Sequence, residues 1–178
     1  MIGEFIQYLK KIKYYFKGIS MTCRISSRVS LNSSRLGRYV NLAHDSSVVN
    51  SLISDRTSVG RYSIVRNSDV GKYCAISWFV TIGADQHPTE RVSGSGAFFL
   101  KLFGLVDCNS SKGQVKRCKI GNDVLIGCNT VIKSGVVIGD GSIIGSGSVV
   151  TRATSLDDFV GELTIKAKTK GNVGTSLV

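Results

Sequence analysis

A six-residue period in the C-terminal half constrains the fold of this chain more than any other feature. From residue 120 the sequence reads IGNDVL, IGCNTV, IKSGVV, IGDGSI, IGSGSV and VT. Six aliphatic residues hold the period without a slip: Ile120, Ile126, Ile132, Ile138, Ile144 and Val150. A small or β-branched residue stands two positions before each of the last five: Val124, Thr130, Val136, Ser142 and Ser148. A weaker version covers residues 59–83, with steps of 6, 5, 6 and 6, and extends upstream to Leu36 and Leu42.

A period of six fits neither the 3.6 of a helix nor the 2 of a long alternating strand. It predicts a short strand followed by a tight turn, repeated. Three such units close a triangular coil of about 18 residues, with the aliphatic residue inward on every face and coils about 4.8 Å apart. Residues 120–155 then form two coils and residues 31–83 about three. We expect glycine and small polar residues at the turns, because they accept backbone angles that bulky residues resist.

Composition narrows the class of protein further. The 178 residues suit one domain, and 42% hydrophobic residues are too many for a disordered chain. No segment approaches the roughly 18 consecutive apolar residues of a membrane span, and no signal peptide is predicted. Five cysteines without a CxxC pair argue against disulfides or a zinc cluster. We therefore expect a cytoplasmic protein.

The net charge of +11 is concentrated at the N-terminus. Residues 1–38 hold eight Lys and Arg against one acidic residue, a net charge of +7. Residues 39–160 hold twelve Lys and Arg against ten acidic residues, a net charge of +2. Residues 1–20 read as a basic amphipathic helix, with Phe5 and Leu9 on its apolar face. This helix either packs on the body or on a partner subunit, or lies peripherally on an anionic membrane surface at its inner face. No nucleic-acid-binding motif accompanies the charge, so nucleic acid is not an expected partner.

The repeat is interrupted between Ile82-Gly83 and Ile120. A long loop inside a regular solenoid is more often functional than accidental. Residues 84–118 form this protruding loop, and it contains His87 beside the only proline of the chain. Asp85 and Glu90 flank His87. A histidine takes a proton near neutral pH and a neighbouring carboxylate supports the imidazolium, so His87 is the candidate general base. The other histidine, His44, lies in the early repeat and is read as structural.

These motifs resemble the hexapeptide-repeat acyltransferases, and in particular their sugar O-acetyltransferase branch. TIGADQHPTERVS followed by AFF resembles the T-I-G…H-P-T-acid…V-S segment of that branch, and residues 120–151 resemble its I-G-N-D-V-W-I-G pattern. The resemblance implies an all-β fold, a left-handed parallel β-helix of hexapeptide repeats over residues 21–160, followed by a C-terminal tail over residues 161–178. It also implies acetyl-CoA as acyl donor, a saccharide acceptor, His87 as general base, and a homotrimer with active sites between subunits.

The resemblance assigns further site residues. The candidates for binding acetyl-CoA are Gly127, Gly145, Ser146, Arg152 and Lys166. Glycines let the donor approach the backbone, and cations suit its phosphates. The candidates for binding the acceptor are Trp78, Asp85 and Glu90. The chain departs from the family at three places: Gly94-Ser95-Gly96 stands where a second histidine-proline pair is usual, Leu125 replaces a tryptophan, and the closing proline turn is absent near Lys166.

Other functions stay open at this level. The same fold carries N-acetyltransferases of amino-sugar nucleotides, and a β-solenoid can be a non-catalytic scaffold. A covalent route would use Cys128, which follows Gly127 and whose spacing indicates a core or turn residue. A zinc enzyme of the carbonic anhydrase kind needs three histidine ligands, and the chain has two, so no metal is expected.

Overall fold

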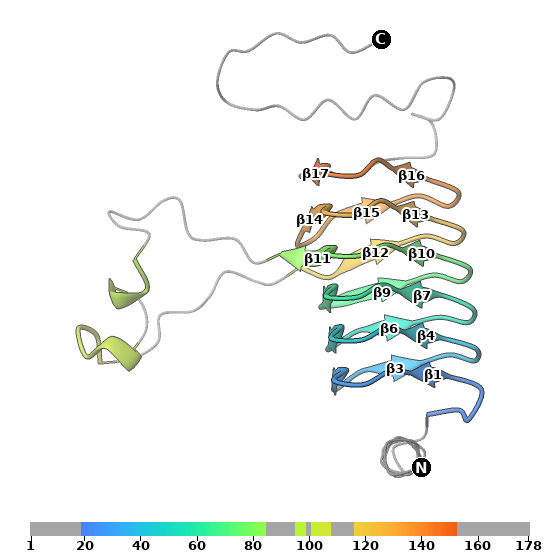
Figure 1. The fold of residues 1–178 in the computed structure, drawn as a ribbon. Helices are drawn as coiled ribbons and strands as arrows, with labels where there is room; N and C mark the ends of the chain where they lie inside the picture. The colour runs from blue at the N-terminus through green and yellow to red at the C-terminus, as the bar shows by residue number, and fades with distance from the viewer. Residues whose placement is uncertain (1–18, 85–94, 99–100, 108–115, 153–178) are drawn as a thin grey trace, which may run out of the picture.

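The computed structural model describes residues 19–84, 95–98, 101–107 and 116–152. Short parallel strands wind into coils that stack on one another, and three sheets form the faces of a triangular prism (Figure 1). We number the coils 1 to 6 from the N-terminal end and name the sheets faces A, B and C. The described part is therefore the all-β, left-handed β-helix of hexapeptide repeats that the sequence predicted.

Faces A and B receive one strand from each of the six coils, and face C receives one from each of the first five. Face A contains β1 (Arg24–Ile25), β4 (Asn41–Leu42), β7 (Ser58–Val59), β10 (Ala75–Ile76), β13 (Leu125–Ile126) and β16 (Ile143–Ile144). Face B contains β2 (Ser30–Asn32), β5 (Ser47–Val49), β8 (Ile64–Arg66), β11 (Thr81–Ala84), β14 (Val131–Lys133) and β17 (Val149–Val150). Face C contains β3 (Arg35–Leu36), β6 (Leu52–Ile53), β9 (Ser68–Val70), β12 (Cys118–Ile120) and β15 (Val137–Ile138).

The length of a coil differs between the two halves. Arg24 pairs with Asn41 and Asn41 with Ser58, a repeat of 17 residues rather than the expected 18. In the C-terminal half Leu125 pairs with Ile143, a repeat of 18. The difference lies at the corner between faces B and C, named corner BC. Two residues separate β2 from β3, whereas three separate β14 from β15.

The interior is a stack of aliphatic side chains, as the period predicted. Ile82, Ile126 and Ile132 are fully buried, and each lies one coil from an aliphatic partner in the same register. The smaller inward positions are also confirmed, because Thr130 and Val124 are buried at corners where the chain bends. Parallel pairing in register thus turns each six-residue unit into one layer of core.

The corners correct the expectation about glycine. In the N-terminal coils the left-handed backbone positions are held by bulky residues, including Tyr39, Tyr62 and Phe79 at φ of 56–58°. Such conformations are uncommon for non-glycine residues and cost about 1–2 kcal/mol each. Stacking between coils offsets this cost: the Tyr62 and Phe79 rings lie 5.0 Å apart and nearly parallel. Glycine takes left-handed positions at Gly135, Gly141 and Gly147 in the C-terminal coils, where Asp123 and Asn129 hold two others.

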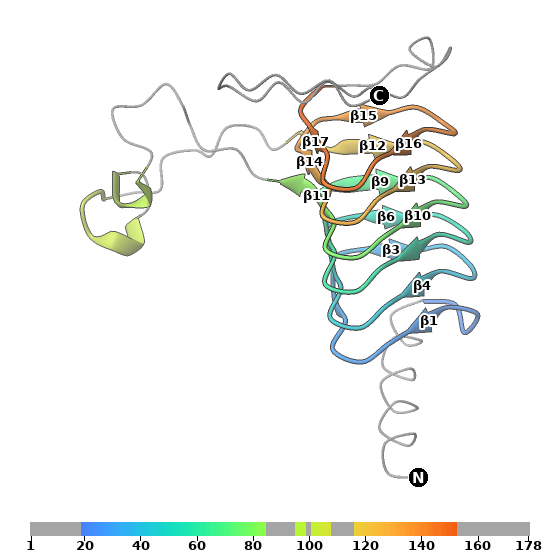
Figure 2. The ribbon, with the colours of Figure 1, turned by 45° about the horizontal axis from the view of Figure 1, so that its top comes forward.

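Between β11 and β12 the chain leaves the coils, and two short 3₁₀ turns, η1 (Gly96–Phe98) and η2 (Lys101–Phe103), lie outside the prism (Figures 1 and 2). The amphipathic helix predicted within residues 1–20 falls almost wholly outside the described residues, and the tail over 161–178 does so entirely. No helix within the described ranges has the length and apolarity needed to cross a bilayer.

Candidate active site

The insertion leaves the prism from a β-bulge at the end of β11. The register of β11 against β14 shifts between Ile82 and Ala84, and Gly83 has a φ of +78°. A side chain at Gly83 would collide with the backbone oxygen of Arg66 in the coil below. Beyond the bulge, the Ser134 N–H donates to the Ala84 oxygen at 3.1 Å. This bulge redirects the chain outward at corner BC, three residues before His87.

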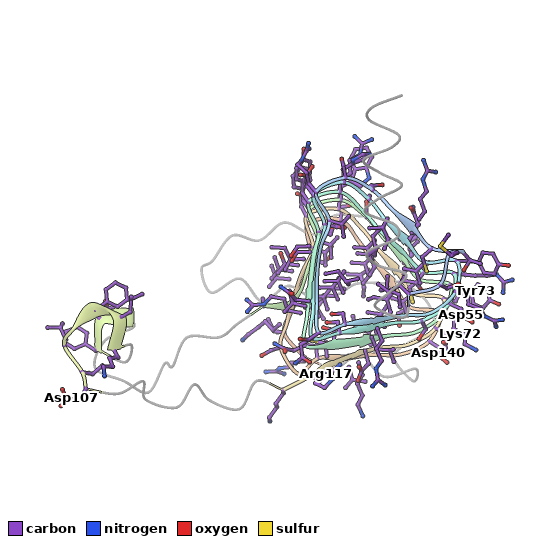
Figure 3. All side chains as sticks on the ribbon, turned by 90° about the horizontal axis from the view of Figure 1, so that it is seen from below. Asp55, Lys72, Tyr73, Asp107, Arg117 and Asp140 are labelled. Atoms are coloured by element: carbon purple, nitrogen blue, oxygen red, sulfur yellow. The ribbon has the colours of Figure 1, made fainter. Side chains whose placement is uncertain are left out.

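Arg117 holds the end where the insertion returns to the prism. Its guanidinium donates to both carboxylate oxygens of Asp69, at 2.5 and 3.2 Å, and to the Asn50 and Ser68 carbonyls at 3.0 and 3.4 Å. The bond to Asp69 raises the pKa of the Arg117 guanidinium further above its usual range. Seen along the axis, Arg117 lies at a different corner from Asp55, Lys72, Tyr73 and Asp140 (Figure 3).

The residues predicted for donor and acceptor binding gather at another corner, between faces A and B, named corner AB. Trp78 occupies this corner in coil 4, and the Asn129 N–H of coil 5 donates to its oxygen at 3.1 Å. Ser146 occupies the equivalent place in coil 6, against Gly127 of coil 5. The Trp78 side chain is 56% exposed, so its ring is available to a ligand.

The two glycines at this corner play different roles. A Cβ on Gly127 would lie 2.5 Å from the Ser146 nitrogen, so stacking of the coils alone requires glycine there. A Cβ on Gly145 would meet, among the described atoms, only Ser148 Oγ within 4 Å, at 3.8 Å. Gly145 belongs to coil 6, the last coil among the described residues, so no described coil packs on it as coil 6 packs on Gly127. Stacking of the described coils therefore explains Gly127 and leaves Gly145 as a candidate for donor binding.

Corner AB and the insertion lie at opposite ends of face B. Strand β11 runs from the Trp78 corner to Ala84, and the strand rise puts the two ends roughly 15–20 Å apart. Arg152 follows β17 at the corner BC end of this face, level with Ser134, and is exposed. His87, Asp85, Glu90 and Lys166 lie outside the described residues. The structure thus brings Trp78, Gly127, Gly145 and Ser146 together and separates them from the stems of the insertion.

Sequence reasoning missed two cations at these corners. Arg61 places its guanidinium 5.6 Å from the centre of the Trp78 ring, within cation–π range. The signal was available, because Arg61 stands 17 residues before Trp78, one coil below it. Arg117 was also missed, and its partners are 48 and 67 residues away in sequence. The partners of Arg117 are found only once coils 2, 3 and 4 are stacked.

Residues 117–152 match the family description "Bacterial transferase hexapeptide (six repeats)". No curated protein sequence matches the chain at a significant level. Among solved structures, the acetyltransferase domain of PglB from Neisseria gonorrhoeae is similar, with 14% identity and a TM-score of 0.56. The alignment covers 85% of this chain and 60% of that domain, so the chain spans less than two thirds of that relative's length.

A variant of AntD, an N-acyltransferase from Bacillus cereus in complex with dTDP and coenzyme A, is also similar. Its identity is 17% and its TM-score 0.58, and the alignment covers 80% of each chain. At these identities the likeness establishes the fold. The protein is a hexapeptide-repeat β-helix whose C-terminal coils match the bacterial transferase repeat, and the structures it resembles are acetyl- and acyltransferases.

Proposed function

We propose that this protein is an acetyl-CoA-dependent O-acetyltransferase of a saccharide, such as a cell-surface polysaccharide or its precursor, with His87 as general base. The observation that carries the proposal is the β-bulge at which the insertion leaves the prism. A register shift around Gly83 ends β11 at Ala84, three residues before His87, in a β-helix whose next coils match the transferase repeat.

His87 would accept the proton of the acceptor hydroxyl as its oxygen attacks the thioester carbonyl. The tetrahedral intermediate carries a negative oxygen, which a backbone N–H stabilises. When the intermediate collapses, the C–S bond breaks and the imidazolium returns the proton to the coenzyme A thiolate. A histidine suits both transfers because its pKa lies near 6.5. Asp85 or Glu90 would orient the ring.

Corner AB would bind the donor. Gly145 and Ser146 lie at this corner, and the donor would extend along face B toward the exposed Arg152, which lies level with Ser134 at the corner BC end and would meet the phosphates, together with Lys166. The residues present therefore fit acetyl-CoA. The exposed ring of Trp78, with Arg61 over it, would pack against the acceptor. Gly127 is kept by the stacking of coils and needs no ligand to explain it.

We propose a homotrimer with active sites between subunits, because the resemblance to the hexapeptide-repeat acyltransferases implies one. Residues 1–20 hold four Lys and one Glu, a balance of +3, and would contact a neighbouring subunit or the inner face of the membrane. We place the protein in the cytoplasm because its five cysteines include no CxxC pair and suit a reducing compartment.

A second candidate is N-acetylation of an amino-sugar nucleotide. It is favoured by the likeness to the AntD structure, an N-acyltransferase structure containing dTDP and coenzyme A. The H-P-T-acid segment at His87 resembles the O-acetylating branch more closely, and this decides our preference. A non-catalytic scaffold is the third candidate.

The full-length protein should be assayed for coenzyme A release from acetyl-CoA across neutral saccharides and amino-sugar nucleotides. We expect turnover with a hydroxyl acceptor, and the product should lose its acetyl group in mild alkali, as an ester does and an amide does not. An alkali-stable product would establish the second candidate. Absence of acetyl-CoA binding by calorimetry would contradict both enzymatic candidates and favour the scaffold.

A further inference from the structure

We propose that Arg61 and Trp78 form a binding site for an acidic saccharide, in which the guanidinium binds the carboxylate or phosphate and the indole packs against the sugar ring. The site rests on the proposed function, and it narrows the acceptor from any saccharide to one that carries a negative charge. The donor positions Gly145 and Ser146 lie two coils above Trp78 at the same corner, about 10 Å of stacked coils away.

The two side chains lie against each other on successive coils. The Arg61 guanidinium of coil 3 lies 5.6 Å from the centre of the Trp78 ring of coil 4, within cation–π range. The indole also reaches back over Gly60, where a Cβ would lie 2.8 Å from the Trp78 Cδ1. The Phe79 N–H donates to the Arg61 oxygen at 3.0 Å, and the Asn129 N–H donates to the Trp78 oxygen at 3.1 Å. The stacked backbone therefore holds both residues in place before a ligand binds, which lowers the entropy cost of binding.

Arg61 carries a positive charge that no described acid neutralises. Arg28, Arg38 and Arg117 each form an ion pair with an aspartate, whereas across the described ranges no carboxylate lies within ion-pair distance of Arg61. The acid of corner AB in coil 2, Asp45, already accepts bonds from Arg28 with both oxygens, at 2.5 and 2.7 Å. The charge of Arg61 is therefore available to an anionic ligand. A guanidinium suits a carboxylate or a phosphate because it can bond two of its oxygens at once.

The indole supplies the apolar part of the site. Its side chain is 56% exposed, and the two coils above place the small residues Cys128 and Ser146 at the equivalent positions. Beside it the Tyr62 and Phe79 rings stack on each other, and both are half-exposed. Ligand sites in proteins combine apolar and aromatic surface with a few charged or polar groups that fix the orientation of the ligand. The apolar face of a sugar can pack against the indole while its acidic group bonds the guanidinium.

The corner between faces C and A, named corner CA, contains a matched control. Arg56 lies between two rings there, 5.3 Å from the centre of the Tyr39 ring and 5.8 Å from that of the Tyr73 ring. Its Nη1 also donates to the Tyr73 hydroxyl at 3.2 Å. Rings from the coils below and above cover this guanidinium, so Arg56 serves the stacking of coils. Figure 3 labels Tyr73 at this corner, away from the Arg117 corner.

The chain has a single tryptophan, so its fluorescence reports on this site. The wild-type protein, Arg61→Met, Arg61→Lys and Arg56→Met are titrated with glucose, glucuronate and glucose 6-phosphate, and with the same three forms of galactose. We expect a uronate or a sugar phosphate to change the Trp78 emission of the wild type and to bind at least about tenfold more tightly than the neutral sugar. Comparison of the two acidic forms shows whether the site prefers a carboxylate or a phosphate.

Arg61→Met removes the charge and keeps an apolar chain against the indole. It should weaken binding of the acidic sugar about 10- to 100-fold, to the level of the neutral sugar, because hydrogen bonds to charged groups contribute that much. Arg61→Lys keeps the charge without the paired donors and should be intermediate. Arg56→Met should bind the acidic sugar like the wild type. Added salt should weaken binding of the acidic sugar and leave the neutral sugar unchanged.

Equal affinity of the wild type for acidic and neutral sugars, or no emission change with any of them, overturns the proposal. Equal weakening by Arg61→Met and Arg56→Met also overturns it. A rise in the Kd for acetyl-CoA in Arg61→Met, without a rise for the acidic sugar, would assign Arg61 to the donor instead. If Arg61→Met does not fold, as judged by its thermal midpoint, Arg61→Lys decides the comparison.

The same measurements separate this site from the proposed function. Coenzyme A release with neutral sugars alone would support the acetyltransferase and defeat the acidic acceptor. Charge-selective binding that depends on Arg61, without any acetyl transfer, would defeat the acetyltransferase and keep the binding site.

Discussion

Gly127 and Ser146 are in contact across two coils, with the position of a Gly127 Cβ only 2.5 Å from the Ser146 nitrogen. This closeness explains the glycine by packing, whereas no described atom except Ser148 Oγ lies within 4 Å of a Cβ placed on Gly145. The sequence predicts that both glycines bind acetyl-CoA. Their different surroundings make the two roles distinguishable by experiment.

Gly127→Ala should destabilise the protein by about 1–3 kcal/mol, because its Cβ forces two stacked backbones apart. Gly145→Ala should leave stability within about 0.5 kcal/mol of wild type and raise the KM for acetyl-CoA. Urea unfolding and donor kinetics measure the two effects. Equal destabilisation by both substitutions would contradict the distinction.

His87→Ala should lower acetyl transfer by about 10²- to 10⁴-fold, since a general base contributes that much, while acetyl-CoA still binds. The matched control is His44→Ala. The His44 ring contacts the Ser27 hydroxyl at 2.7 Å, at corner AB between coils 1 and 2, far from the insertion stems. His44→Ala should keep turnover within about threefold. Similar losses in both variants would remove the case for His87.

The cysteines should differ in reactivity. Cys23, Cys74 and Cys118 are buried, and each thiol donates to a carbonyl of the neighbouring coil. Burial raises the pKa of the Cys74 thiol, which disfavours its reactive thiolate. We expect native alkylation at the partly exposed Cys128 and none at the buried three, by peptide mass mapping. Cys128→Ser should remain active, and loss of activity there would revive a covalent mechanism.

The Arg28–Asp45 pair should show a pH-dependent effect. The hydrogen bond from Arg28 lowers the pKa of Asp45 in the folded protein. The stabilisation is therefore present above the unfolded pKa, near 3.9, and is lost as the pH falls through the lower folded value. Because Arg28 is exposed and solvent screens the pair, the effect is small. The thermal midpoint of Arg28→Ala should lie slightly below wild type at pH 7, with the gap closing near pH 2. A gap that widens in acid would contradict this assignment.

Much of the fold was readable because a β-helix is built from local repeats. Each six-residue unit supplies one strand and one corner, so the residues that face inward follow directly from the period, as Ile126 and Ile132 show. The shorter coils were harder to predict. In the sequence, the missing residue at corner BC shows only as one spacing of five between aliphatic positions. Its effect on coil length depends on the two-residue turn that joins β2 to β3.

Corner chemistry was not readable in the same way. Turn propensity favours glycine at left-handed positions, yet Tyr62 and Phe79 occupy two of them. Their ring stacking is a contact between coils, and propensity scales describe single residues. Likewise the carbonyl that excludes a side chain at Gly83 belongs to Arg66, in the coil below.

By itself the sequence determined the architecture of this protein: a period of six, an inward aliphatic residue in each unit, and an interruption that contains His87. Local spacing suffices for that, because every layer repeats the one before. Only the tertiary structure decided which predicted residues meet. Stacking brought Trp78, Gly127 and Ser146 to one corner and set Arg117 on Asp69 and Asn50 at another. These contacts join residues as far as 67 positions apart, and such proximity arises from the closure of coils, which no local pattern encodes.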